Sequence, residues 1–206
     1  PPAPIWKEGD HTTHFSLIDS EGNAVAATLS TNMPFGAAFT VPNTGVLLND
    51  EMDDFAADLQ GNNAYGLSGS TANAIAPGKR PLSSMSPTFI ESPDDLAVFG
   101  TPGGSRIPSM VLLAILQYMD AQPIARWPAV PRFHHQYLPD KLEYEPGAFS
   151  PAQLEELTAR GHHPEQVSRR YGNQQVVRWS KQDNRVEAAS DPRGVGLAAT
   201  QPAVIE

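Results

Sequence analysis

The chain has 206 residues, of which 40% are hydrophobic and none is cysteine, and its formal net charge is −9. This length and apolar content predict one domain, or a large part of one, with a substantial core. The negative charge disfavours a nucleic-acid or anionic-membrane partner. The absence of cysteine excludes a disulfide framework, a cysteine-based zinc site and a cysteine nucleophile. No apolar run is long enough to span a bilayer.

The N-terminal part of the sequence predicts a linker, a β-hairpin and a long loop. Residues 1–11 are rich in proline and polar side chains, which is typical of an extended linker. Apolar and polar residues alternate over 13–18 and over 24–30, with the turn sequence SEGN between them, so these segments predict a hairpin. Residues 45–48 predict a short buried strand. Residues 56–78 are rich in Gly, Asn, Ser and Ala and predict a surface loop.

The second half predicts further strand pairs. Residues 86–90 and 96–100 predict two strands joined by a turn, and residues 174–180 and 186–189 predict a hairpin. Residues 127–139 are rich in Pro and His and predict an irregular segment.

Two helices complete the expected elements. Residues 108–120 carry proline near their start and a broad apolar face. A second helix starts with Ser150 as its N-cap and Pro151 at its first position, and Gly161 ends it. Strands, helices and strands follow one another without βαβ alternation, which favours the α+β class, with antiparallel sheets and segregated helices.

Two adjacent threonines, Thr12 and Thr13, open the first predicted strand. β-branched residues are common in strands, so this pair alone carries no functional signal. A threonine hydroxyl becomes a nucleophile when its own freed α-amino group takes its proton, since that amine titrates near neutrality.

Three further polar clusters have both a simple and a chemical interpretation. Residues 50–54 are acid-rich and form either a solvated turn or a set of acceptors for an ammonium group. Ser83 and Ser84 form either an ordinary turn or a carboxylate site. Gly103 and Gly104 form either a flexible connection or an oxyanion hole made of two backbone N–H groups. No phosphate-loop or dinucleotide spacing surrounds them.

Two histidine pairs raise the question of a metal. His134-His135 and His162-His163 lack ligand spacing with carboxylates, and no HExxH motif is present. We therefore expect neither a metal nor a cofactor.

Taken in order, four segments resemble the small catalytic subunit of the γ-glutamyltranspeptidases, which are N-terminal-nucleophile hydrolases. The segments are His11–Asp19, Asn49–Phe55, Arg80–Pro87 and Gly100–Arg106, and the resemblance extends from Thr12 to Arg193. It implies an αββα sandwich of the α+β class, of which this chain holds only the small-subunit part.

The same resemblance divides the chain and implies a partner. Residues 12–206 would be the small-subunit domain, and residues 1–11 would be the C-terminal end of the large-subunit region of one precursor. The opening Pro1-Pro2-Ala3-Pro4 is consistent with a piece cut from that precursor. The resemblance also implies a periplasmic or secreted protein, whose export signal would lie upstream.

The resemblance assigns the catalytic roles to four positions. Thr12 would be the nucleophile, both for the substrate and for self-cleavage at the carbonyl of His11. Antiparallel pairing in the first hairpin could place the Ser30 hydroxyl beside Thr12, where it would assist. Gly103 and Gly104 would form the oxyanion hole.

Substrate binding is implied at six further positions. Asn32, Glu51 and Asp54 would surround the α-ammonium group of a γ-glutamyl substrate. Ser83 and Ser84 would bind its α-carboxylate, together with an arginine of the large subunit. Tyr65, in a lid, would hydrogen-bond the position of Asn32 and close the pocket.

The function implied is cleavage of γ-glutamyl amide bonds, in glutathione and related compounds, through a γ-glutamyl-threonine intermediate, with transfer to water or an amino acid. One alternative is an acylase of the same superfamily, such as a cephalosporin acylase, which we expect to lack the amino-acid clamp. Another is an unprocessed, inactive C-terminal fragment. With the His11–Thr12 bond intact, the chain as given is expected to be inactive, because Thr12 then has no free amine.

Overall fold

The computed structural model describes residues 11–56, 61–67, 69–168 and 170–201. The first hairpin pairs β1 (Thr12–Ile18) with β2 (Ala24–Ser30) in antiparallel register, from Thr12 opposite Ser30 to Ile18 opposite Ala24. The turn contains Gly22 with φ of +85°, a conformation that glycine adopts without steric cost. The predicted hairpin is therefore confirmed.

A four-stranded antiparallel sheet forms the centre of the molecule, in the order β3-β4-β8-β9. Strand β4 lies between β3 and β8, and all of its residues after Asp95 are buried. The predicted strand pairs are confirmed, with shifts of one or two residues at some of their ends. The strands are β3 (Thr88–Glu91), β4 (Asp95–Gly100), β8 (Gln175–Ser180) and β9 (Arg185–Ser190).

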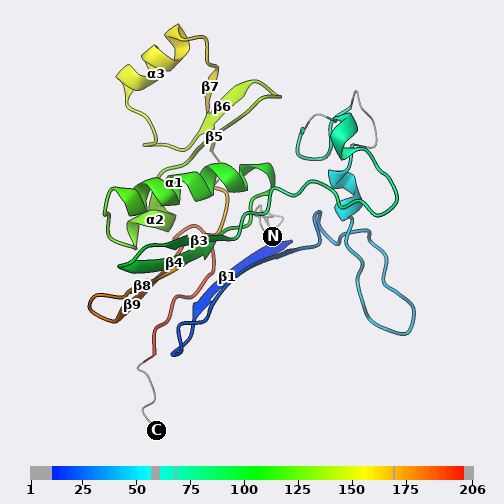
Figure 1. The fold of residues 1–206 in the computed structure, drawn as a ribbon. Coiled ribbons are helices and arrows are strands. Elements are labelled where there is room, and N and C mark those ends of the chain that lie inside the picture. The colour runs from blue at the N-terminus through cyan, green and yellow to red at the C-terminus, as the bar shows by residue number, and fades with distance from the viewer. Residues whose placement is uncertain (1–10, 57–60, 68, 169, 202–206) are drawn as a thin grey trace, which may run out of the picture.

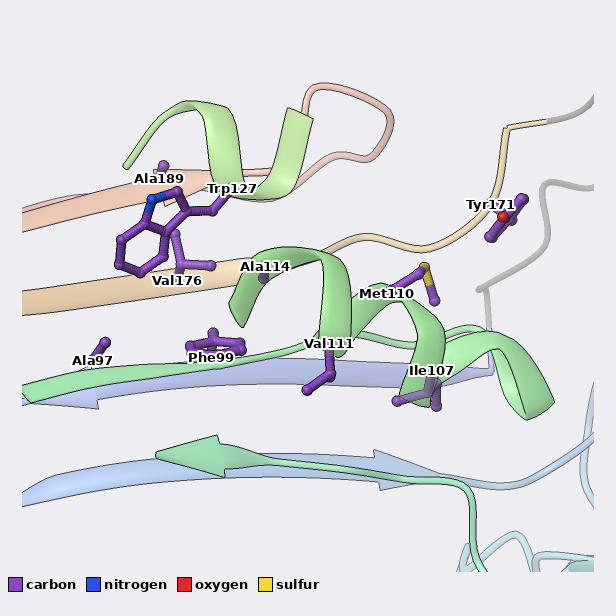
Figure 2. Packing of buried hydrophobic residues seen from close by; sticks show 10 residues of the cluster. All are labelled: Ala97, Phe99, Ile107, Met110, Val111, Ala114, Trp127, Tyr171, Val176 and Ala189. Atoms are coloured by element: carbon purple, nitrogen blue, oxygen red, sulfur yellow. The ribbon is translucent and has the colours of Figure 1, made fainter. Parts of the chain in front are cut away.

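Helices cover one face of this sheet, and the first hairpin covers the other (Figure 1). On the helical side, α1 (Ile107–Met119) and α2 (Arg126–Ala129) enclose the main core, in which Phe99 and Val176 of the sheet lie near Trp127 (Figure 2). On the hairpin side, Leu96, Val98 and Val177 pack against residues of β1 and β2. The layers are thus helix, sheet and hairpin, as burial of both faces of a sheet requires.

No layer formed by the described residues covers the outer face of the hairpin. Phe15 is 49% exposed and Leu29 is 54% exposed, and the alternate positions between them on this face include Leu17 and Val25, which are also exposed. Side chains alternate between the two faces of a strand, so this face is apolar throughout most of the hairpin.

A smaller sheet lies at the N-terminal end of α1. It pairs β5 (Phe133–Gln136) with β6 (Lys141–Tyr144) and β6 in parallel with β7 (Pro164–Gln166). The predicted second helix is α3 (Pro151–Ala159), and Ser150 and Gln153 form a capping box at its start. The described residues also form three short 3-10 helices: η1 (Glu51–Asp54), η2 (Thr71–Asn73) and η3 (Gly104–Arg106).

Two sequence predictions about local structure were wrong. Residues 45–48 do not form a buried strand, because they lie in an irregular excursion that none of the described layers covers. Val46 is 53% exposed, and an isolated bridge joins Thr40 to Leu47. Residues 127–139 are not irregular, because they contain most of α2 and all of β5. Pro128 is tolerated there because the first turn of a helix needs no N–H donor.

Where residues 56–78 are described, η2 is their one helix and they form no strand, in agreement with the predicted loop. The helices of the described part of the chain are all too short or too polar to cross a bilayer.

Candidate active site

The register of the first hairpin places two hydroxyl groups together. Because Thr12 lies opposite Ser30, the Oγ1 of Thr12 is 2.8 Å from the Oγ of Ser30. The backbone N–H of Asn32 donates to the same Ser30 oxygen at 2.8 Å. The side chain of Ser30 is therefore held beside Thr12, at the open end of the hairpin, where β1 starts and β2 ends.

The peptide bond before Thr12 is part of the same ladder. The backbone N–H of Thr31 donates to the carbonyl oxygen of His11 at 3.1 Å. The nitrogen of Thr12 is an amide in this intact chain, so it cannot act as a base. A donor is nevertheless already in place at the carbonyl that the Thr12 hydroxyl would attack.

Two adjoining cavities meet at Thr12. The inner cavity has a volume of about 20 Å³ and the outer cavity one of about 500 Å³. Thr12, Asn32, Tyr65 and Gly104 line both, whereas Gly103 belongs to the outer cavity. The other predicted site residues line the inner cavity: Ser30, Glu51, Asp54, Ser83 and Ser84.

The acidic wall of the inner cavity comes from η1. Burial and the negative charges of Glu51 and Asp53 raise the pKa of Asp54 to about 6. The pKa of Glu51 is also raised, by burial and by the charge of Asp50. The buried Oε1 atom of Glu51 has no hydrogen-bond partner among the described residues. This oxygen is unsatisfied, and a cation bound between Glu51 and Asp54 would be stabilised.

Tyr65, in the loop that follows η1, lines the same cavity as Glu51 and Asp54. Its hydroxyl donates to the carbonyl oxygen of Asn32 at 3.1 Å, so the expected contact is made, and it is made to the backbone of Asn32. Burial and the charge of Asp54 raise the pKa of Tyr65 to about 12, which keeps the hydroxyl protonated as a donor. Asn32 itself is buried and has a positive φ of 69°.

The two glycines that follow β4 are required by their surroundings. Gly103 has φ of +145° and Gly104 has φ of +58°, which disfavour any other residue. A Cβ atom on Gly103 would lie 2.4 Å from Cε of Met110, and one on Gly104 would lie 2.5 Å from Cε1 of Tyr65. The backbone of this segment therefore approaches Thr12 without side chains of its own, as an oxyanion hole would need.

The Ser83-Ser84 segment is tied to the acidic wall by a residue that sequence reasoning did not identify. The Nδ2 of Asn73 donates to the carbonyl of Asp54 at 2.6 Å, and its Oδ1 accepts from the N–H of Leu82 at 3.0 Å. One asparagine side chain thus links η1 to Leu82, the residue that precedes the serine pair. Nothing in the loop sequence distinguished Asn73 from the neighbouring polar residues.

His14 is a second residue that the analysis of the sequence missed. It is 6% exposed, and its Nδ1 and Nε2 atoms lie 2.8 and 2.9 Å from the hydroxyls of Thr28 and Ser16. Ser16 donates its own proton to the carbonyl of Gln175, so Nε2 carries the proton of His14. Burial lowers the pKa of His14 to about 4. The His14 ring packs against Gly100, since a Cβ atom on Gly100 would lie 2.3 Å from Cε1 of His14. The absence of a side chain on Gly100 thus lets β1 pack closely on β4.

The first histidine pair makes ordinary polar contacts, and the ring of His162 lies edge-on to that of His135. His134 lies 2.8 Å from the hydroxyl of Ser109, and His135 lies 2.9 Å from a carboxylate oxygen of Asp140. Within the described ranges, no group of three or more His, Cys, Asp or Glu side chains could hold a metal ion.

Comparison with known proteins identifies the family of the chain. Residues 2–201 match the gamma-glutamyltranspeptidase family. The chain is 44% identical over 190 residues to the glutathione hydrolase proenzyme of Escherichia coli, covering 91% of this chain and 32% of that protein. It is 43% identical over 196 residues to the glutathione hydrolase proenzyme of Pseudomonas aeruginosa, covering 92% of this chain and 34% of that protein. The chain thus spans about a third of the length of these relatives.

Solved structures agree. The γ-glutamyltranspeptidase from Pseudomonas nitroreducens complexed with L-DON has a TM-score of 0.82 and 41% identity, covering 92% of this chain and 100% of that chain. Cephalosporin acylase from Bacillus halodurans has a TM-score of 0.70 and 21% identity, covering 92% of this chain and 34% of that chain, which shows a shared fold alone. These matches confirm the expected α+β fold class. The chain is a member of the γ-glutamyltranspeptidase family of N-terminal-nucleophile hydrolases.

Proposed function

We propose that this chain is the catalytic small-subunit part of an enzyme that cleaves γ-glutamyl amide bonds, in glutathione and related compounds, and passes the glutamyl group to water or to an amino acid. One observation carries the proposal: the Thr12–Ser30 hydroxyl pair opens onto a cavity whose walls hold the carboxylates of Glu51 and Asp54, of which Oε1 of Glu51 has no partner among the described residues, and a serine pair. The curated relatives named above as glutathione hydrolase proenzymes support it.

The inner cavity would bind the amino-acid end of the γ-glutamyl group. Its α-ammonium would lie between Glu51, Asp54 and Asn32, where the unpartnered Oε1 of Glu51 would gain a donor. Its α-carboxylate would accept from the hydroxyls of Ser83 and Ser84. An arginine of the large subunit would complete the carboxylate site.

The reaction would take place where the two cavities meet. The freed α-amino group of Thr12 takes the hydroxyl proton as Oγ1 attacks the γ-carbonyl carbon. The N–H groups of Gly103 and Gly104 stabilise the oxyanion, and the amide C–N bond breaks as the leaving amine takes the proton. The glutamyl group is then an ester on Thr12. Water or an amine attacks this ester, the C–Oγ1 bond breaks, and Oγ1 regains a proton.

The same hydroxyl would mature the precursor. Oγ1 of Thr12 attacks the carbonyl carbon of His11, whose oxygen already accepts from the N–H of Thr31. The hydroxyl proton passes to the Thr12 nitrogen as the C–N bond breaks, so the Thr12 amine is released and an ester forms between the His11 carbonyl and Oγ1 of Thr12. Water hydrolyses this ester and leaves a carboxylate on His11. Until then Thr12 lacks its base, so the intact chain would be inactive.

A large subunit of the same precursor would be the partner. The exposed apolar face that includes Phe15, Leu17, Val25 and Leu29 supports this, because monomers rarely leave such a face uncovered. A periplasmic or secreted location, and the assignment of residues 1–11 to the large-subunit region, are proposed from the family resemblance alone.

An assay of the complete precursor, after maturation, tests the function. γ-Glutamyl-p-nitroanilide should be hydrolysed much faster than glutaryl-p-nitroanilide, which lacks the α-ammonium. Equal rates on the two anilides would favour the cephalosporin-acylase-like alternative instead. An inactive protein whose Thr12 is shown by N-terminal sequencing to be free would contradict both.

A further inference from the structure

The loop segment that carries Tyr65 is fastened on its acidic side. Asn63 folds it into a tight turn, since its Oδ1 accepts from the N–H groups of Tyr65 and Leu67 at 3.0 Å each. Asn63 also donates through Nδ2 to Asp54 at 3.3 Å. These contacts shape residues 61–67 and join them to η1. They do not attach the segment to the opposite side of the outer cavity.

Gln136, at the end of β5, makes that second attachment. Its Nε2 donates to the carbonyl oxygens of Tyr65 at 3.2 Å and of Leu138 at 2.9 Å. Its Oε1 lies 2.8 Å from Nε2 of His134, a residue that is 6% exposed. Two carbonyls require a donor, so the amide group of Gln136 can face them in one orientation only. His134 must then carry its proton on Nε2, and its Nδ1 accepts from the hydroxyl of Ser109.

Packing agrees with the hydrogen bonds. A Cβ atom on Gly66 would lie 3.3 Å from Pro139 and 3.6 Å from Nε2 of Gln136, so the loop touches the β5–β6 connection along its backbone. On its other side the Tyr65 ring lies against Gly104. A continuous chain of contacts therefore runs from α1 through His134 and Gln136 to the residue that covers the expected oxyanion hole.

We propose that Gln136 is a positioning residue that holds Tyr65 in its closed place over Asn32 and Gly104. The hydrogen bond to the Tyr65 carbonyl fixes the backbone of the loop, and the Tyr65 hydroxyl then reaches the carbonyl of Asn32. The kinetic consequences of this arrangement rest on the proposed function, whereas the attachment of the loop does not. Gln136 touches the loop rather than the expected position of the substrate's glutamyl group.

The first measurement is kinetic and uses the matured full-length enzyme. Gln136→Leu removes the donor, and Gln136→Glu keeps the acceptor for His134 but sets a carboxylate against two carbonyl oxygens. For both variants we expect KM for γ-glutamyl-p-nitroanilide to rise about tenfold, with a much smaller change in kcat, because the loss of one or two hydrogen bonds weakens closure. Gln182→Leu is the matched control, since this exposed glutamine lies in the β8–β9 turn, at the opposite end of the sheet from Gly100.

A double-mutant cycle then tests whether Gln136 acts through Tyr65. Tyr65→Phe removes the hydroxyl that donates to Asn32. If the two residues serve one closure, the combined rise in KM is clearly smaller than the product of the single effects. A rise in KM of the double variant equal to the product of the two single rises, with normal activity of the wild type, would overturn the proposal and leave the proposed function intact.

Hydrogen exchange tests the attachment without turnover. The amides of residues 61–67 should exchange faster in Gln136→Leu and Gln136→Glu than in the wild type, and remain unchanged in Gln182→Leu. Equal protection in all four proteins would overturn the proposal whatever the enzyme does. Absence of γ-glutamyl hydrolysis in the matured wild type, together with faster exchange in the Gln136 variants, would instead contradict only the proposed function.

Discussion

The aromatic ring of Tyr65 lies directly against Gly104, and a Cβ atom on Gly104 would come 2.5 Å from Cε1 of Tyr65. Tyr65 of the loop thus contacts Gly104 of the expected oxyanion hole. A substitution at either residue should shift the position of the other.

Gly104→Ala should therefore impair catalysis more than folding. The new methyl group meets the Tyr65 ring, and the φ of +58° strains any residue with a Cβ. We expect kcat/KM for γ-glutamyl-p-nitroanilide to fall by about a hundredfold, comparable to the loss of an oxyanion donor. Adding Tyr65→Ala to Gly104→Ala relieves the clash but not the strain, and should recover only part of the activity. Unchanged kinetics in Gly104→Ala would contradict both the oxyanion-hole role of Gly104 and the importance of its contact with Tyr65.

Thr12→Ala in the full-length precursor should abolish self-cleavage and γ-glutamyl hydrolysis together, because one hydroxyl serves both acyl transfers. Thr12→Ser, which keeps a hydroxyl, should retain both at a reduced rate. Denaturing gels and N-terminal sequencing report cleavage, and the anilide assay reports turnover. A cleaved, active Thr12→Ala protein would show that another hydroxyl, such as that of Ser30, is the nucleophile.

Asp54→Ala should chiefly damage the use of donors that carry an ammonium group. A hydrogen bond to a charged partner contributes roughly 1.5–3 kcal/mol, so kcat/KM for γ-glutamyl-p-nitroanilide should fall about ten- to a hundredfold. The slow hydrolysis of glutaryl-p-nitroanilide should change little, and this second substrate is the internal control. An equal loss on both anilides would contradict the contact with the ammonium group.

The preference for γ-glutamyl donors should depend on pH through Asp54. Its pKa is raised to about 6 in the free protein, so the carboxylate is protonated, and loses its charge, as the pH falls below that value. The ratio of kcat/KM for γ-glutamyl-p-nitroanilide to that for glutaryl-p-nitroanilide should fall with it. Protonation of the Thr12 amine affects both substrates and cancels in the ratio. The dependence should be weaker in Asp54→Asn, where Glu51 is the remaining carboxylate at the ammonium group.

His14 should make the fold sensitive to acid. Burial lowers its pKa to about 4 from 6.5, so the unfolded chain takes up a proton before the folded one does. The contribution of neutral His14 to stability is complete above pH 6.5 and is lost as the pH falls towards 4, by about 2 to 3 kcal/mol at pH 4.5. Denaturant unfolding of the Thr12→Ala precursor, with and without His14→Gln, should show a weaker pH dependence in the second protein. Parallel pH profiles would contradict this.

The sequence by itself determined most of the local elements and the chemistry of the site residues. Alternating side chains and an SEGN turn specify the first hairpin, because a period of two and turn-forming residues act over short distances. The same local rules specify α3 through its capping box. The contact of Ser30 with Thr12 follows from the hairpin register, so it too could be predicted from local information.

Only the tertiary structure decided how the distant segments meet. The contact of Tyr65 with Gly104, the link from Asn73 to Asp54 and the attachment of Gln136 to the Tyr65 carbonyl each join residues that no periodicity relates. The same holds for the raised pKa of Asp54, since burial and neighbouring charges exist only after the chain has folded. Residues 45–48 show the converse: their apolar sequence predicts a buried strand, but burial requires a covering layer, and none of the described elements covers them.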